Sequence, residues 1–135
     1  MINSCVGPYF AYDEDMHTPP SDCPFCLANN LLATPILAET EGGFLTAAQS
    51  HPGNYLIIPR VHAESIAELP DDWMRDFKQL IVHVPGLGHF NIAVNVGRHA
   101  GQTVNHLHFW IVPRADNEPA TGKGLVTLVR HANAM

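Results

Sequence analysis

The sequence predicts an α+β domain with a mostly antiparallel sheet of about five strands and one or two helices packed on it. Two observations support this class. Short apolar, β-prone runs recur along the chain between turn-forming glycines and prolines, and one stretch has the apolar spacing of an amphipathic helix. A helix and a half-buried sheet bury their apolar faces most simply against each other.

The amino-terminal part precedes the predicted sheet. Residues 1–22 contain prolines and an acidic patch without sustained periodicity, and we expect an extended arm there, followed by a single domain over residues 23–135. The apolar spacing over residues 27–32 predicts a short helix that must end by Thr34, because Pro35 disfavours a helical residue before it.

The remaining elements follow from alternation and turn residues. We expect strands over residues 36–39, 43–48, 55–59, 90–96 and 105–112. Between the third and fourth strands, Asp71 or Asp72 can cap a helix with an apolar stripe of Trp73, Phe77, Leu80 and Ile81, which should stop near Pro85. Residues 125–129 fit an edge strand or a short helix, and periodicity does not decide between them.

Composition limits the function classes. The 135 residues are 46% hydrophobic and 15% charged, which suits one compact domain. The net charge of −6 with seven Lys and Arg argues against a nucleic-acid partner. No apolar run approaches the roughly twenty residues that span a bilayer, so we expect no membrane partner. The odd number of cysteines, three, suits a reducing compartment, so a cytoplasmic protein is expected.

The segment 101–114 holds the main candidate site. In a strand, His106, His108 and Trp110 share one face, whereas Leu107, Phe109 and Ile111 share the other. Neighbouring imidazoles can divide the work of nucleophile, proton carrier and metal ligand. The alternative is a strand that carries two histidines with ordinary hydrogen bonds.

This segment resembles the signature of the histidine triad (HIT) superfamily, which places H-x-H-x-H after G-Q-[ST]-V-x and before a Pro-Arg pair. The resemblance extends upstream through the strand and loop over residues 90–100 and the segment 53–62, and covers residues 23–114. It implies a HIT-like fold, a homodimer, and a nucleotide or other small phosphate ester as substrate.

The resemblance also implies site roles. His108 would attack the α-phosphorus and form a transient covalent intermediate, with His106 and Gln102 as further catalytic residues. The ring nitrogen of His108 that does not attack phosphorus would donate a hydrogen bond to a backbone carbonyl. The substrate would contact His108 and six further residues: Asn95, His99, Gly101, Gln102, Thr103 and Trp110. Without the motif, ordinary turn capping would explain Asn95, Gln102 and Thr103 equally well.

Three positions depart from the family pattern. Trp110 replaces the usual third histidine and cannot carry a proton, so leaving-group protonation must come from elsewhere or be unnecessary, unless the site has decayed. Thr46 replaces an aspartate that binds both ribose hydroxyls, which predicts altered nucleoside recognition. Asn54 replaces a frequent histidine.

The C-x-x-C of Cys23 and Cys26, with His62 and His106, resembles the structural zinc site of some family members. A redox dithiol is the alternative, and Cys5 has no expected role. His17, His51, His83, His89 and His131 are expected on the surface or in packing. Two functions remain: a hydrolase or nucleotidyl transferase acting through His108, or a non-catalytic nucleotide-binding or zinc-stabilised interaction module.

Overall fold

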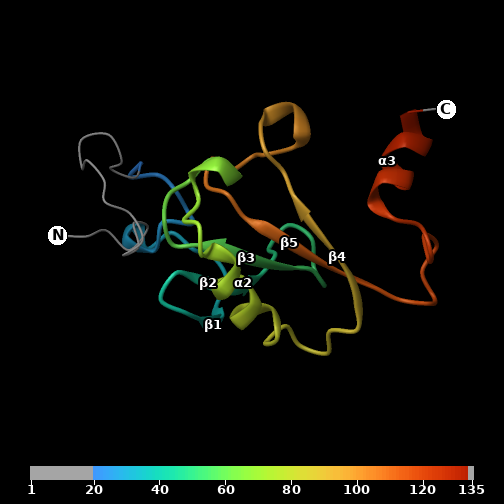
Figure 1. Cartoon of the computed structure of the whole chain (residues 1–135), viewed down its shortest axis with the longest axis horizontal. Coiled ribbons are helices and arrows are strands. Elements are labelled where there is room, and N and C mark those ends of the chain that lie inside the picture. Colours follow the sequence, from blue (N-terminus) through green and yellow to red (C-terminus); the bar gives the residue numbers. More distant parts are fainter. Residues whose placement is uncertain (1–19, 134–135) are drawn as a thin grey trace.

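The computed structural model describes residues 20–133, with side chains up to residue 130. Its centre is a five-stranded sheet in the order β1-β2-β3-β5-β4, in which each neighbouring pair is antiparallel (Figure 1). The strands are β1 (Ile36–Glu39), β2 (Gly43–Ala47), β3 (Tyr55–Pro59), β4 (His89–Val94) and β5 (Phe109–Arg114). The predicted fold class is therefore confirmed. The predicted arm of residues 1–22, with Cys5 and His17, lies almost entirely outside the described residues.

The last two strands differ from their predicted bounds. The fourth ends at Val94 instead of residue 96, and the fifth begins at Phe109 instead of residue 105. Residues 105–108 leave the ladder because the chain there contacts the loop after β3: the Leu107 N–H donates to the Ala63 carbonyl at 2.6 Å. The two histidines consequently lie in the approach to β5.

One face of the sheet is covered by α2 (Trp73–Ile81), which contacts β2 and β3. The core on this side contains Leu45, Ile57, Trp73, Phe77, Leu80, Val84 and Ile111. Asp72 takes the N-cap position as predicted, but its side chain pairs with Arg75 at 2.9 Å instead of capping the helix. The helix ends four residues before Pro85, and turn hydrogen bonds follow it.

The other face carries a second cluster, made by Phe44, Ala48, Leu56 and Ile58. The segment before β1 packs here, and the predicted helix over residues 27–32 is instead a single 3₁₀ turn, η1 (Leu27–Asn29). It ends at Asn30, whose φ of 56° is left-handed. The Asn29 side-chain amide donates to the Pro20 and Cys23 carbonyls, which favours a compact turn over a longer helix.

The carboxyl-terminal segment forms a helix, α3 (Leu125–Asn133), and not an edge strand. It stands apart from the sheet in Figure 1. Within the described range, neither helix is long and apolar enough to cross a membrane. Two short 3₁₀ turns, η2 (Ile66–Glu68) and η3 (Arg98–Ala100), lie in the loops that surround the candidate site.

Candidate functional site

The predicted alternation of faces holds around the start of β5. Phe109 stacks on Trp73 and meets Phe77 on the helix-covered face. Trp110 packs against the second cluster on the opposite face, and the centroids of the His108 and Trp110 rings are 6.0 Å apart. Phe25 contacts both His106 and His108 edge-on, at centroid separations of 6.0 and 5.1 Å. The two histidines therefore lie on the side away from α2.

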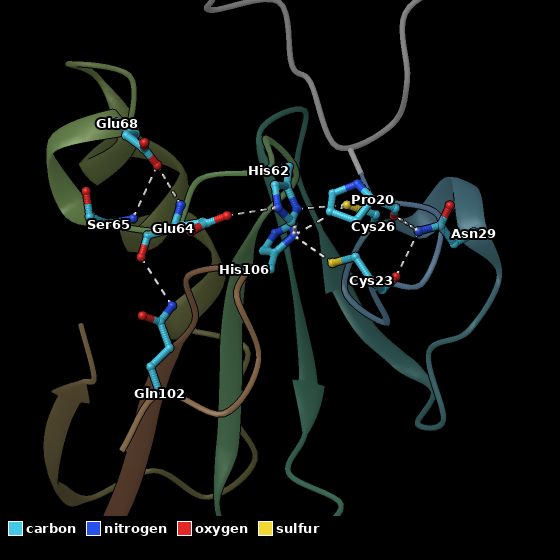
Figure 2. A network of polar contacts seen from close by, with 10 residues as sticks. All are labelled: Pro20, Cys23, Cys26, Asn29, His62, Glu64, Ser65, Glu68, Gln102 and His106. Carbon is cyan, nitrogen blue, oxygen red and sulfur yellow. Dashed lines mark hydrogen bonds and ion pairs between the residues drawn. The ribbon is translucent and has the colours of Figure 1, made fainter. Parts of the chain in front are cut away.

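Four potential metal ligands converge beside these histidines, as Figure 2 shows. The ligand atoms of Cys23, Cys26, His62 and His106 all lie within 4.8 Å of one another. The Nδ1 atoms of His62 and His106 are 3.2 Å apart, and the sulfur-to-Nδ1 separations run from 3.2 to 3.6 Å. A tetrahedral zinc ion with usual bond lengths sets its N and S ligands about 3.3 to 3.8 Å apart. These residues thus fit zinc in both chemistry and spacing.

His106 is oriented for this cluster by its other nitrogen. Its Nε2–H donates a hydrogen bond to the Pro59 carbonyl oxygen at 2.7 Å, which leaves the lone pair on Nδ1. Burial is the main cause that lowers the pKa of His106, to about 3, although the Pro59 hydrogen bond opposes the shift. Burial likewise lowers the pKa of His62. Both imidazoles are therefore neutral near pH 7, the form that binds metal.

The two cysteines differ in state. Cys23 is a buried free thiol, whereas Cys26 is disulfide-bonded in this structure. Burial raises the pKa of the Cys23 thiol. Only a thiolate binds zinc, so any zinc-bound form of this cluster is a reduced form.

A pocket of about 560 Å³ opens on the same side of the sheet. Its wall is mostly apolar, and His108 is the one titratable side chain among the described residues that line it. The lining residues come from the segment before β1, the end of β2 and its turn, β3, and the approach to β5: Pro24, Phe25, Leu31, Leu32, Ala33, Thr34, Ala47, Ala48, Gln49, Ser50, Leu56, Thr103, Val104, His108 and Trp110.

His108 has the hydrogen bond that the sequence led us to expect. Its Nδ1–H donates a hydrogen bond to the carbonyl oxygen of His106 at 2.8 Å, so the lone pair is on Nε2. Burial is the main cause that lowers the pKa of His108, and this hydrogen bond partly opposes it. A neutral imidazole with a fixed tautomer, at the wall of a pocket, is equipped to act as a nucleophile.

Gln102 lies beside the site but not in its wall. It is buried, its Oε1 accepts from the Gly97 N–H at 2.9 Å, and its Nε2 donates to the Glu64 carbonyl at 3.2 Å (Figure 2). These bonds join the loop of residues 97–101 to the loop after β3. The structure therefore places Gln102 where it can position the loop.

The other expected phosphate ligands are not all brought together. Thr103 lines the pocket with His108 and Trp110. The Asn95 amide contacts the Gly101 carbonyl at 3.4 Å, and His99 borders a separate hollow formed by residues 96–100. Gly101 has a φ of +96°, which favours glycine at this loop end.

Thr46 is fully buried, and its hydroxyl is used within the protein. Its Oγ1 donates to the Pro35 carbonyl at 2.7 Å and accepts from the Thr34 hydroxyl at 2.6 Å. The part of the pocket wall that the structure describes contains no carboxylate. The position that binds a ribose in the family pattern is therefore closed to that role here.

Two parts of the site were missed from the sequence. The apolar wall formed by Phe25, Leu31 and Leu32 depends on the packing of an irregular segment, although the aromatic residue between two candidate ligands was a usable signal. His51 was expected on the surface or in packing, and its exposed ring meets Trp110 edge-to-face at 5.3 Å and 88°; nothing in the sequence indicated that this contact lies beside the pocket.

Comparison with known proteins agrees with this fold and motif. The HIT domain family matches residues 43–117. An uncharacterized HIT-like protein of Methanocaldococcus jannaschii is 35% identical over 71% of this chain and 81% of its own length. An adenosine 5'-monophosphoramidase of Schizosaccharomyces pombe is 35% identical over 76% of this chain and 81% of its own. A zinc-bound histidine triad family protein from Mycobacterium smegmatis shares the fold, with a TM-score of 0.59 at 23% identity, over 86% of this chain and 100% of that one. The chain belongs to the HIT family.

Proposed function

We propose that this protein is a nucleotide hydrolase that cleaves a phosphoramidate or phosphoanhydride bond at the α-phosphate, through a covalent intermediate on His108. The observation that carries the proposal is the hydrogen bond from His108 Nδ1 to the His106 carbonyl, which leaves the lone pair on Nε2 as the nucleophile. The phosphoramidase activity named for the related yeast protein supports the same reaction class. Transfer of the nucleotidyl group to a second phosphate, in place of water, uses the same first step.

The residues of the chain divide the work as follows. His108 attacks phosphorus, and the hydrogen bond to the His106 carbonyl stabilises the positive charge that develops on its ring. We assign His106 a part in the reaction through its backbone carbonyl, because its side chain belongs to the candidate metal cluster. Thr103 offers a hydroxyl to the phosphate oxygens. Gln102 holds the loop of residues 97–101 against the loop after β3.

The test is cleavage of nucleoside phosphoramidates, dinucleoside polyphosphates and nucleotide sugars by wild-type protein and His108→Ala, read by chromatography. We expect turnover by the wild type and a loss of at least about 10³-fold in the variant, because the nucleophile is removed. Circular dichroism controls for folding, and His83→Gln, a change at an exposed histidine, should leave turnover unchanged. Equal turnover in wild type and His108→Ala would refute the mechanism. Silence from both would favour a non-catalytic nucleotide-binding module.

We further propose that Cys23, Cys26, His62 and His106 hold a structural zinc ion in the reduced protein. Phe25 lies between the two cysteines in sequence and lines the pocket. A metal ion at the cluster would therefore fix one wall of the pocket as well as join the amino-terminal segment to the sheet. The zinc ion itself would supply stability, with no part in the reaction.

Elemental analysis of protein purified with a reductant and without added metal tests the zinc site. We expect about one equivalent, and we expect Cys23→Ser to lose both the metal and several degrees of thermal stability, since structural zinc contributes folding free energy directly. His83→Gln is the matched control. Less than about a tenth of an equivalent, with Cys23→Ser as stable as wild type, would favour the plain thiol interpretation.

The fold also leaves apolar surface that a homodimer would cover. Phe90 and Ile92 on the edge strand β4 are exposed, as are Val126 and Val129 on α3. We propose that this surface pairs with a second copy of the chain.

A further inference from the structure

The site described so far assigns no residue to protonate the leaving group. Trp110 lines the pocket beside His108, but its indole N–H does not titrate. Among the described residues, its buried Nε1 also has no hydrogen-bond partner. Within residues 20–133, no Asp, Glu, Lys, Arg or Cys lines the pocket, and the one titratable residue of its wall, His108, is the nucleophile. A described residue that donates a proton to the leaving group would therefore lie at the rim of the pocket.

The turn between β2 and β3 places a histidine at that rim. The wall of the pocket runs along the turn through Gln49 and Ser50, and His51 follows directly, with an exposed side chain whose ring contacts Trp110 edge-to-face. Ser50 belongs to the pocket, and its hydroxyl lies 2.7 Å from His51 Nδ1. His51 is therefore connected to the pocket by both its ring and its Nδ1.

The backbone of the turn is fixed, so this placement does not depend on a mobile side chain alone. The Asn54 N–H and its side-chain amide both donate to the His51 carbonyl, at 3.2 and 3.1 Å. The Ala48 N–H in turn donates to the Asn54 carbonyl at 2.9 Å, which closes the hairpin. Asn54, for which the sequence suggested no consequence, thus holds His51 in position.

We propose that His51 is the general acid that protonates the leaving group, in place of the titratable residue that Trp110 lacks. This inference rests on the proposed function. The Ser50 hydroxyl occupies Nδ1, so Nε2 is the nitrogen that carries the transferable proton. The described groups that face the ring are Ser50 and Trp110, with His108 beyond the indole, and no carboxylate or other cation is among them.

The steps balance with water as the only co-substrate. His108 Nε2 forms a bond to phosphorus, the bond from phosphorus to the leaving nitrogen or oxygen breaks, and its electron pair takes the proton from His51 Nε2. Water then attacks phosphorus and releases a proton to the solvent, the electron pair of the His108–phosphorus bond returns to the imidazole, and His51 regains its proton from the solvent. The products are the protonated leaving group and a nucleoside monophosphate, with both histidines restored.

The experiment compares two derivatives of the same nucleotide: a phosphoramidate whose leaving group is an alkylamine, and an ester whose leaving group is 4-nitrophenol. General acid catalysis is worth about 10²- to 10⁴-fold where the leaving group is poor, and little where it leaves as a stable anion. We expect His51→Gln to lower kcat for the alkylamide at least about 100-fold and to change kcat for the nitrophenyl ester less than about threefold. His83→Gln should behave as wild type on both substrates.

The outcomes separate the two proposals. Equal activity of wild type and His51→Gln on the alkylamide overturns the role of His51, and so does an equal loss on both substrates, which would mean that the substitution merely disturbs the turn. In either case the hydrolase proposal stands if His108→Ala is inactive. If wild type and His108→Ala do not differ on the nitrophenyl ester, the hydrolase proposal itself fails, and the assignment of His51 fails with it.

Discussion

At the scale of single residues, the buried Thr46 hydroxyl has the clearest consequence for substrate choice. A site that binds a ribose hydroxyl through a buried polar group rejects the deoxy analogue strongly, because that group is then left unpaired. Here the Thr46 hydroxyl is hydrogen-bonded to Thr34 and Pro35, and no carboxylate is among the described residues that line the pocket. The loss of a ribose hydroxyl therefore leaves no buried partner unpaired in the pocket.

We expect the kcat/KM values of a ribonucleoside phosphoramidate and its 2'-deoxy analogue to agree within about threefold. Steady-state kinetics with the wild-type protein measures this directly and avoids a substitution at a buried position. A relative of the family that carries the usual aspartate is the comparison, and it should prefer the ribose. A deoxy substrate worse by about 100-fold or more would show that another group in the pocket binds the ribose.

The buried His106 links stability to pH in the metal-free, reduced protein. Its pKa of about 3 in the folded chain lies below the ordinary value of 6.5. The unfolded chain therefore binds more protons between these values, and stability that is complete above pH 6.5 is lost progressively as the pH falls toward 3. The lowered pKa values of His62 and His108 act in the same direction.

Urea unfolding at pH 7 and pH 5 measures this loss. One such proton is worth up to about 1.4 kcal/mol per pH unit, so we expect the free energy of unfolding to fall by at least about 1 kcal/mol between these two pH values. In His106→Asn the dependence should be weaker, even though the variant starts less stable, whereas His83→Gln should keep it. A free energy of unfolding that is the same at both pH values would contradict the neutral, buried state of His106.

At the scale of elements, alternation and turn residues were enough to predict the sheet but not the ends of its strands. The strand over residues 55–59 and the helix from Trp73 were predicted closely, because each has a clear apolar pattern and a turn residue beside it. Strand β5 begins later than predicted, because His106 bonds to Pro59 and Leu107 bonds to Ala63. Such contacts join segments more than forty residues apart, and local pattern does not contain them.

The same distinction applies to the candidate site. Spacing and resemblance indicated the convergence of Cys23, Cys26, His62 and His106, since each lies in a recognisable motif. They could not indicate whether Gln102 faces the substrate or the protein, because its two backbone partners come from separate loops. They also gave no sign of His51, whose importance depends on the ring of Trp110 on the neighbouring strand β5.

At the scale of the whole molecule, the face of the sheet that α2 covers is buried unevenly. α2 contacts β2 and β3, and the edge strand β4 is not among the elements that it contacts most. Ile92 lies opposite Ile111 in the register of β4 and β5, so the two share this face, yet Ile111 is fully buried while Ile92 is 48% exposed. Phe90, two residues before Ile92, is 37% exposed. Such a patch beside an exposed edge strand is typical of a surface that a partner covers.

We therefore expect a homodimer that buries β4, and we expect Ile92→Lys to convert it to a monomer, because the charge would have to be desolvated in the interface. Sedimentation velocity at micromolar concentration measures the change. The matched control is Ile66→Lys, at an isoleucine that is 51% exposed in η2, away from the edge strand, and it should remain dimeric. Circular dichroism checks that both variants fold. A monomeric wild type, or a dimer in Ile92→Lys, would exclude this surface as the interface and leave the exposed side chains of α3 as the next candidate.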